Sequence, residues 1–284
     1  MGFLIRPSRR EFFALAGAAL LRGAPKSTRW ALFSDTHVPE DPAGEYRGFK
    51  PYENLRAVVS EVLDASPAGA VIDGDLARLK GLPGDYRNLA ALLEPLTARM
   101  PVAMALGNHD NRGNFLAAFA HPAGRRQPVE GKFVTLIDAG PVRFLLLDSL
   151  IRTNYTPGLL GKKQRDWLDA FLRSAGPKPI LVFLHHTLDD RDMSLLDVLW
   201  MFRILKPHRA VKAVVYGHSH AYQFDAEDGL HLINIPATGY NFNDGEPVGW
   251  VETELSAAGA DLRLHAIGGN TSGDGKITSV AWRG

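Results

Sequence analysis

Short apolar runs recur along the chain and alternate, in its first half, with segments of helical spacing. Trp30 to Phe33, Ala70 to Ile72 and Val102 to Leu106 are continuous apolar runs that predict buried strands. Asn54 to Leu63 and Tyr86 to Ala98 lie between these runs and carry apolar residues at helical spacing. Alternation of strands and helices is typical of an α/β layered fold.

The second half contains more pairs of strands that read as hairpins. Lys132 to Ile137 and Val142 to Leu147 are strand-like runs joined by Asp138-Ala139-Gly140-Pro141, which is a turn signal. Two further helices are predicted at Gly161 to Ser174 and Leu195 to Leu205, and further strands at Ile180 to Leu184, Val211 to Tyr216, Leu230 to Ile235, Trp250 to Leu255 and Leu262 to Ala266. The pattern predicts an α/β fold in which two mixed sheets form a sandwich flanked by helices.

The N-terminal segment is expected to lie outside this domain. Arg9-Arg10 precedes an apolar run from Phe12 to Leu21, which is too short to span a bilayer because a spanning helix needs about 20 residues. Arg22-Gly23-Ala24 then offers small residues where a signal peptidase could cut. The layout resembles a bacterial twin-arginine export signal, and a surface amphipathic helix is the alternative interpretation.

This interpretation sets the expected domain boundaries and location. Residues 1–27 would be an export signal and short linker, and residues 28–284 would form one domain. The protein would then be periplasmic or secreted, and the export machinery would be a partner.

Composition restricts the partners and the kind of metal site. The chain has 284 residues, of which 45% are hydrophobic and 22% charged, as in an ordinary globular protein. A formal net charge of +1 gives no electrostatic case for a nucleic-acid or membrane partner. The chain contains no cysteine, so a metal site would have to use nitrogen and oxygen ligands. Nothing in the sequence indicates an oligomeric state.

Five short polar motifs follow predicted strands in chain order. They are Asp35-Thr36-His37, Gly74-Asp75, Gly107-Asn108-His109-Asp110, His185-His186 and Gly217-His218-Ser219-His220. Each motif alone is weak, but ligands in open α/β sheets gather at the carboxyl ends of strands. We therefore expect one metal centre built from seven side chains: Asp35, His37, Asp75, Asn108, His185, His218 and His220. The loops from Pro39 to Pro51 and from Pro236 to Pro247 are expected to wall the pocket.

The spacing within the motifs suggests how each would contribute. Side chains at i and i+2 of an extended segment point the same way, so Asp35 and His37 could hold one ion, and His218 and His220 could do the same. The carboxylate of Asp75 could bridge two cations. Consecutive residues point to opposite faces, so only one histidine of the pair at 185 and 186 should enter the site.

The Asn108-His109-Asp110 motif combines a ligand with candidate catalytic residues. Asn108 offers a neutral carbonyl oxygen, and His109 beside it would be held over the metals without needing to bind them. Asp110 could orient His109 through a ring nitrogen.

The ordered motifs resemble those of the calcineurin-like metallophosphoesterase superfamily over the chain from about Trp30 to His220. Leu147-Asp148-Ser149 and the segment from Gly158 to Leu168 are similar to the cyclic-nucleotide and glycerophosphodiester phosphodiesterase branch. The chain departs from that branch at Thr187, where proline is common. It departs from the purple acid phosphatases at Arg78, where they place a tyrosine, so a tyrosinate-bound ferric ion is not expected.

This resemblance implies a four-layer α/β/β/α fold and two divalent or mixed-valence transition-metal ions, with Mn, Fe, Zn and Co not distinguished. One ion would be held by Asp35, His37, Asp75 and His220, and the other by Asp75, Asn108, His185 and His218. A metal-bridging water would attack phosphorus, and His109 would protonate the leaving oxygen. Of the histidine pair, His185 rather than His186 would be the ligand.

The expected function is therefore that of an exported dinuclear metal-dependent phosphoesterase acting on phosphodiesters of small molecules. A phosphomonoesterase or nucleotidase on the same site is the alternative, although the chain leaves little length for the added domain of the large two-domain nucleotidases. A non-catalytic metal-binding scaffold is a further alternative, but such proteins typically lose ligands. A zinc peptidase would need another spacing, such as His-Glu-x-x-His, which is absent.

Overall fold

A computed structural model of the protein describes residues 26–284. The export signal that the sequence predicts lies outside the described residues, apart from the end of its short linker. Among residues 26–284, no helix has the length and apolar character that crossing a membrane requires.

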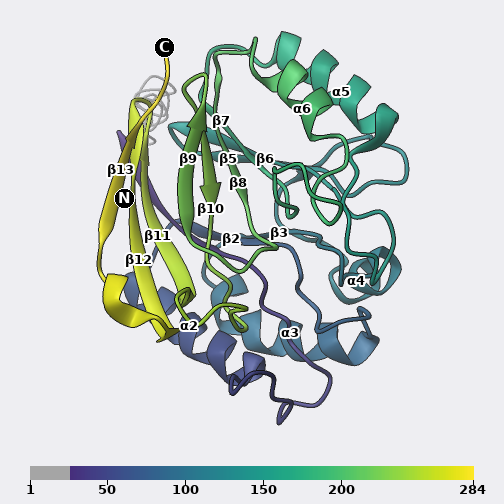
Figure 1. The fold of residues 1–284 in the computed structure, drawn as a ribbon, viewed down its shortest axis with the longest axis vertical. Coiled ribbons are helices and arrows are strands. Elements are labelled where there is room, and N and C mark those ends of the chain that lie inside the picture. Colours follow the sequence, from purple (N-terminus) through teal and green to yellow (C-terminus); the bar gives the residue numbers. More distant parts are fainter. Residues whose placement is uncertain (1–25) are drawn as a thin grey trace, which may run out of the picture.

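Two mixed β-sheets form the centre of the molecule (Figure 1). The first sheet has the order β13-β12-β11-β1-β2-β3, with β1 (Ser27–Phe33), β2 (Gly69–Asp73), β3 (Val102–Ala105), β11 (Pro247–Ser256), β12 (Gly259–Gly269) and β13 (Ile277–Ala281). The second has the order β4-β5-β6-β7-β8-β10-β9, with β4 (Arg125–Arg126), β5 (Thr135–Ala139), β6 (Val142–Leu146), β7 (Ile180–Phe183), β8 (Val211–Tyr216), β9 (Gln223–Glu227) and β10 (Leu230–Asn234).

Helices cover the outer faces of both sheets. They are α2 (Pro51–Ala65), α3 (Pro83–Thr97), α4 (Arg112–Ala118), α5 (Gly161–Ser174) and α6 (Val198–Leu205), and a 3₁₀ turn, η1 (Thr271–Gly273), follows β12. Figure 1 shows α2 and α3 on one side of the molecule and α5 and α6 on the other. Pro51 and Pro83 each open a helix, a position where the missing N–H costs nothing.

Alternation along the buried strands explains the four layers. In β1, Ala31 and Phe33 pack toward α2 and α3, whereas Trp30 and Leu32 point into the space between the sheets. Leu181 of β7 meets them there, while Val182 packs under α5 and α6. Three apolar clusters thus separate four layers, which confirms the predicted α/β/β/α sandwich.

The sequence reading missed several short elements and shifted several boundaries. The prediction omitted α4, β4, β9, β13 and η1, and it began α6 three residues early, at Leu195. Strand β9 is polar and largely exposed, and β4 is only two exposed residues long. These strands show little alternation of apolar and polar residues because they lie at sheet edges, where few side chains are buried.

Parallel strands place the motifs at one edge. Strands β1, β2 and β3 run parallel in the first sheet, and β6, β7, β8 and β10 run parallel in the second. The five motifs follow β1, β2, β3, β7 and β8, so both sheets contribute to one site at their carboxyl ends.

Candidate metal centre

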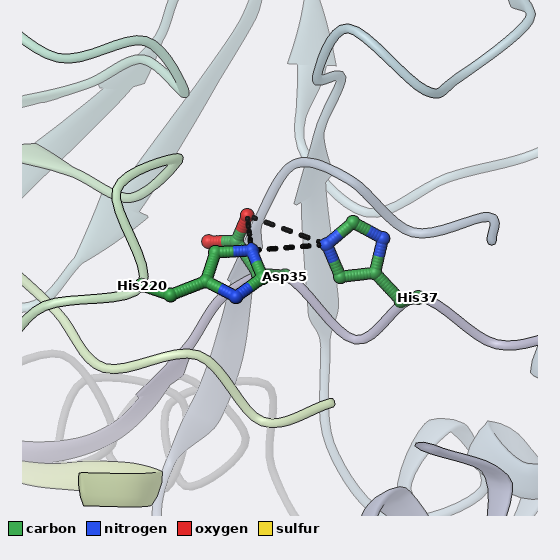
Figure 2. Close-up of side chains that lie close together, drawn as sticks. All are labelled: Asp35, His37 and His220. Atoms are coloured by element: carbon green, nitrogen blue, oxygen red, sulfur yellow. Dashed lines mark hydrogen bonds and ion pairs between the residues drawn. The ribbon is translucent and has the colours of Figure 1, made fainter. Parts of the chain in front are cut away.

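Asp35, His37 and His220 form a first triad with buried side chains (Figure 2). The Nε2 atoms of His37 and His220 lie 3.1 Å apart. Asp35 Oδ1 lies 3.2 Å from the Nε2 of His220 and 3.8 Å from that of His37. Because two ring nitrogens and one carboxylate oxygen face a common point, this triad can hold one cation.

Asp75, His185 and His218 form a second triad beside the first. Asp75 Oδ2 lies 3.3 Å from His185 Nε2 and 3.9 Å from His37 Nε2, so it faces ligands of both triads. Asp35 Oδ1 also lies 3.7 Å from His185 Nε2. The two triads fit two divalent ions, and Asp75 is placed to bridge them.

Each histidine of the triads is held by a main-chain carbonyl through its other ring nitrogen. The four carbonyls are those of Arg78 for His37, Asp73 for His185, Met193 for His218 and Tyr240 for His220, at 3.2, 2.8, 3.0 and 2.5 Å. A nitrogen facing a carbonyl oxygen donates its proton, which leaves the other ring nitrogen with a free lone pair. The fold therefore sets the tautomer that metal binding needs.

Among the seven expected ligands, three buried polar atoms have no hydrogen-bond partner: Asp35 Oδ1, Asn108 Oδ1 and His185 Nε2. Buried polar atoms are nearly always paired, so an unpaired group in the interior needs an explanation. All three belong to residues that the sequence assigns as ligands, and two of them face the triad atoms described above. This donor set fits metal ions, which would satisfy all three atoms.

The ionisable groups of the site are strongly perturbed by burial and by one another. Burial is the largest single influence on Asp35 and Asp75 and raises the pKa of each. The neighbouring histidines together outweigh it, His185 and His220 at Asp35 and His185 and His109 at Asp75, so both pKa values end below their usual range. Burial lowers the pKa of His185, yet Asp75 and Asp35 together raise it to about 10. Burial lowers the pKa of His37 to about 3 and, with His185 nearby, that of His218 to about 4. Ionised carboxylates and neutral imidazoles are the forms that ligate metals, so the shifts at Asp35, Asp75, His37 and His218 favour ligation, whereas His185 would have to release a proton when a metal binds.

The backbone at the ligands is not extended, which corrects the expected geometry. Asp35, His37 and Asp75 have φ values of 51°, 46° and 45°, and His218 and His220 have 70° and 53°. Non-glycine residues rarely adopt this left-handed region, and such strain clusters at functional sites. Asp35 and His37 thus converge through two left-handed turns rather than through strand alternation.

Glycines let the loops approach the ligands closely. A Cβ on Gly107 would lie 2.2 Å from Asp75 Oδ1, and one on Gly74 would lie 2.6 Å from His185 Nδ1. Gly74 also has a φ of +84°, which a side chain would strain. The glycines of two motifs are therefore required by packing against the ligands.

His109 lines the pocket, but Asp110 does not contact its ring. His109 Nδ1 lies 3.0 Å from the carbonyl oxygen of Leu79, and its Nε2 lies 3.9 Å from Asp75 Oδ2. Asp110 instead accepts from the main-chain N–H groups of Leu76, Ala77 and Gly107 and from the Tyr86 hydroxyl. The expected orientation of His109 by Asp110 is therefore wrong, because Asp110 ties together the loops that follow β2 and β3.

His186 belongs to neither triad. Its Nδ1 lies 2.7 Å from the hydroxyl oxygen of Ser149, which belongs to the Leu147-Asp148-Ser149 motif. Burial lowers its pKa well below the usual value, so the ring is neutral. Its ring centre lies 4.8 Å from that of His218, against which it packs.

A pocket of about 370 Å³ opens over the triads. Its lining includes His37, Asp75, Asn108, His109, His218 and His220, together with Thr156, Thr187, Arg191, Met193, Ser194, Ser219 and Phe242. The sequence motifs did not indicate Phe242 or Met193. The ring of Phe242 stacks on that of His220, with ring centres 4.1 Å apart. The loop from Pro236 to Pro247 lines the pocket through Phe242, as predicted. The carbonyl of Met193, which accepts from His218, could not be predicted because no sequence motif marks it.

Comparison with known families and sequences gives consistent matches. The family described as calcineurin-like phosphoesterase matches residues 28–222. A 3′,5′-cyclic adenosine monophosphate phosphodiesterase of Pseudomonas aeruginosa is 28% identical, over 88% of this chain and 90% of the relative. A glycerophosphodiester phosphodiesterase of Enterobacter lignolyticus is 31% identical, over 73% of this chain and 76% of the relative.

Solved structures show the same fold at lower identity. A dimetal phosphatase from Danio rerio superposes with a TM-score of 0.68 at 17% identity, covering 90% of this chain and 99% of that one. A purple acid phosphatase from yellow lupin superposes with a TM-score of 0.65 at 16% identity, covering 90% of this chain and 54% of that one.

Proposed function

Because the chain belongs to the calcineurin-like phosphoesterase family and is a metal-dependent phosphoric ester hydrolase, we propose that its substrates are phosphodiesters of small molecules. The observation that carries the proposal is Asp75 Oδ2, which faces His37 of one triad and His185 of the other. Two bound cations would supply charge neutralisation at phosphorus and activation of water.

The residues of the chain would supply the remaining steps. The ring of His109 is partly exposed in the pocket, and its Nδ1 donates to the Leu79 carbonyl. Only the doubly protonated ring would have a proton on Nε2 to give to a leaving oxygen. Asn108 precedes it and would fix the backbone by ligating a metal. Asp110 would act through the loops that it binds rather than on the imidazole.

The charge of the pocket favours a diester over a monoester. A monoester carries a charge of about −2 at neutral pH, and a diester carries only one negative charge. The arginine that lines the pocket, Arg191, is paired with Asp189, whose Oδ2 lies 2.8 Å from the arginine Nε. A cation neutralised in this way is less available to a second phosphate charge. The names of the relatives, which are phosphodiesterases, support the same choice.

A substrate panel on metal-reconstituted protein tests the proposal. It compares bis(p-nitrophenyl) phosphate, p-nitrophenyl phosphate, a 3′,5′-cyclic nucleotide and a glycerophosphodiester. We expect a higher kcat/KM for the chromogenic diester than for the monoester, and loss of both activities in Asp75→Asn. Preference for the monoester would identify a phosphomonoesterase and overturn the proposal.

We further propose that the protein is exported to the periplasm or beyond through an N-terminal twin-arginine signal. The support is Arg9-Arg10 followed by the apolar run from Phe12 to Leu21. Replacing Arg9 and Arg10 with lysine should leave the protein in the cytoplasmic fraction, while Arg22→Lys, which keeps the pair, should still be exported. Equal distribution of both variants would contradict this route.

A further inference from the structure

Helix α6 exposes apolar side chains on the face that turns away from the sheet. Leu199 and Trp200 are 69% and 56% exposed, and Met193 and Leu196 just before the helix are 60% and 54% exposed. We call these four residues the α6 patch. The opposite face of the helix is already buried, through Val198, Met201, Phe202 and Leu205. A helix that is apolar all round is normally covered on all sides.

The two ends of the α6 patch carry opposite charges. Asp190 and Asp192 are exposed just before Met193 in the chain, and Arg191 between them is paired with Asp189, so the segment keeps a net negative charge. Arg203 is exposed at the other end, and its guanidinium lies over the ring of Trp200, 4.8 Å from the ring centre. The patch is therefore an apolar strip with an acidic end and a basic end.

We propose that the α6 patch binds the same patch of a second copy of this chain about a two-fold axis. A two-fold pairing is self-complementary when a strip has opposite charges at its ends, because the acidic end of each copy meets the basic end of the other. Four large side chains exposed to this degree amount to roughly 400 Å² of apolar surface per copy, which is the size of the largest apolar patch on a typical monomer and is often functional. With a polar rim, two copies can reach the approximately 1,600 Å² of a standard interface.

This interface adjoins the metal pocket. Met193 belongs to the patch and also lines the pocket, and its carbonyl oxygen receives the Nε2 proton of His218 at 3.0 Å. Gly158 holds this segment through two backbone hydrogen bonds: its N–H donates to the carbonyl of Ser194 at 3.0 Å, and its carbonyl accepts from the N–H of Leu196 at 2.9 Å. A second copy would cover the side chain of Met193 and hold the loop that orients His218.

Charge reversal in the full chain tests the proposal, with sedimentation velocity over a range of concentrations as the readout. The wild type should dimerise, and Arg203→Glu or Asp192→Arg alone should weaken the dimer by about tenfold. The double variant that carries both reversals should restore it, because the charges are exchanged and kept complementary. Leu199→Glu should abolish the dimer, while Ile277→Glu, at an exposed apolar position on β13, should not.

Several outcomes would overturn the proposal. A wild type that stays monomeric at high concentration would do so, as would a dimer lost in Ile277→Glu but kept in Leu199→Glu. Binding to phospholipid vesicles that Leu199→Glu removes, without self-association, would assign the patch to a membrane instead. Circular dichroism and metal content of each variant exclude misfolding as the cause of a lost dimer.

Discussion

At the scale of single residues, neighbouring side chains within one motif make different contacts, so substituting one or the other should have different effects on metal binding and turnover. His185 faces Asp35 and Asp75 through Nε2, whereas His186 bonds to Ser149. His109 lies in the pocket beside Asn108. Adjacent residues of the same type or motif should therefore behave differently.

His185→Ala should lose one metal equivalent, while His186→Ala should keep both. The reason is that His185 Nε2 lies 3.3 Å from Asp75 Oδ2 within a triad, whereas His186 belongs to neither triad, bonds to Ser149 and packs on His218. Metal content by mass spectrometry after gel filtration checks this expectation. The opposite result would reverse the assignment and leave the general site unchanged.

His109→Ala should keep both metals and the fold and should slow turnover according to the leaving group. General-acid catalysis is typically worth ~10²–10⁴-fold, and an alkyl alcohol needs that proton more than p-nitrophenolate does. We therefore expect a large loss of kcat for an alkyl diester and a small loss for bis(p-nitrophenyl) phosphate. His121→Ala, at an exposed position, is the control. Equal losses on both substrates would mean that His109 positions the phosphate instead.

At the scale of elements, a buried polar network joins the end of β6 to α4 and α5. Arg112 of α4 pairs with Asp148, with Nε and Oδ2 2.6 Å apart, and Gln164 of α5 bonds to the backbone N–H and C=O of Asp148. The next residue, Ser149, bonds to His186. The Leu147-Asp148-Ser149 motif thus connects two helices to the histidine that packs behind the metal site.

Gly158→Ala should destabilise the protein by ~1–3 kcal/mol, the usual cost of overpacking. A Cβ at this position would lie 2.4 Å from Cγ of His186, which is fixed by Ser149 and cannot move freely. Chemical denaturation measures the effect. Gly113→Ala in α4 is the matched control, because its nearest neighbour would be 3.4 Å away, and it should be neutral or stabilising by up to about 1 kcal/mol. A neutral Gly158→Ala would show that His186 is not held in place.

Lys132 should make the stability of the protein depend on pH in the alkaline range. Its Nζ donates to the carbonyls of Leu150 and Leu159 at 2.9 and 2.8 Å, and burial lowers its pKa from 10.5 to about 8 despite the nearby Asp148. Below about pH 8 the lysine is protonated in both the folded and the unfolded state, so it adds no pH dependence. Between the two pKa values the unfolded state binds more protons, and the free energy of unfolding rises with pH.

Between about pH 7.5 and pH 10, the free energy of unfolding of the wild type should therefore rise relative to that of Lys132→Met, by at most about 3 kcal/mol. Urea unfolding at the two pH values measures it. Lys276→Met, which removes a charge from an exposed position, is the control. A difference that is independent of pH would show that Lys132 keeps its ordinary pKa in the fold.

At the scale of the whole molecule, the metal site joins the two sheets. Asp35 and Asp75 follow strands of the first sheet, and His185 and His218 follow strands of the second. Metal removal should therefore lower the Tm of the entire fold, since an ion present at 1,000 times its Kd stabilises by about 4 kcal/mol. Calorimetry with and without chelator measures this loss. Asp75→Asn should show a much smaller difference, and an equal difference would place the stabilising ion elsewhere.

Sequence alone was sufficient where a pattern repeats or a motif is local. Buried strands such as β1 and β7 are continuous apolar runs, and α5 has apolar residues at helical spacing, so both kinds of element were predicted close to their observed bounds. The ligand residues were identifiable because each motif directly follows such a strand. Strands β4, β9 and β13 were missed because edge strands bury few side chains and therefore carry little pattern.

Tertiary structure decided how those residues are used. Asp110 can look like the orienting partner of its neighbour in sequence. Folding instead brings three donors to its carboxylate, two from the loop after β2 and one from α3, in addition to the N–H of Gly107 in its own loop. The carbonyl of Met193 and the ring of Phe242 reach the site from loops with no motif, because any residue supplies a carbonyl and many supply an apolar wall. The sequence thus determined which side chains could bind metal, since ligand chemistry belongs to residue type. Only the fold determined their partners and tautomers, since these depend on contacts between segments far apart in the chain.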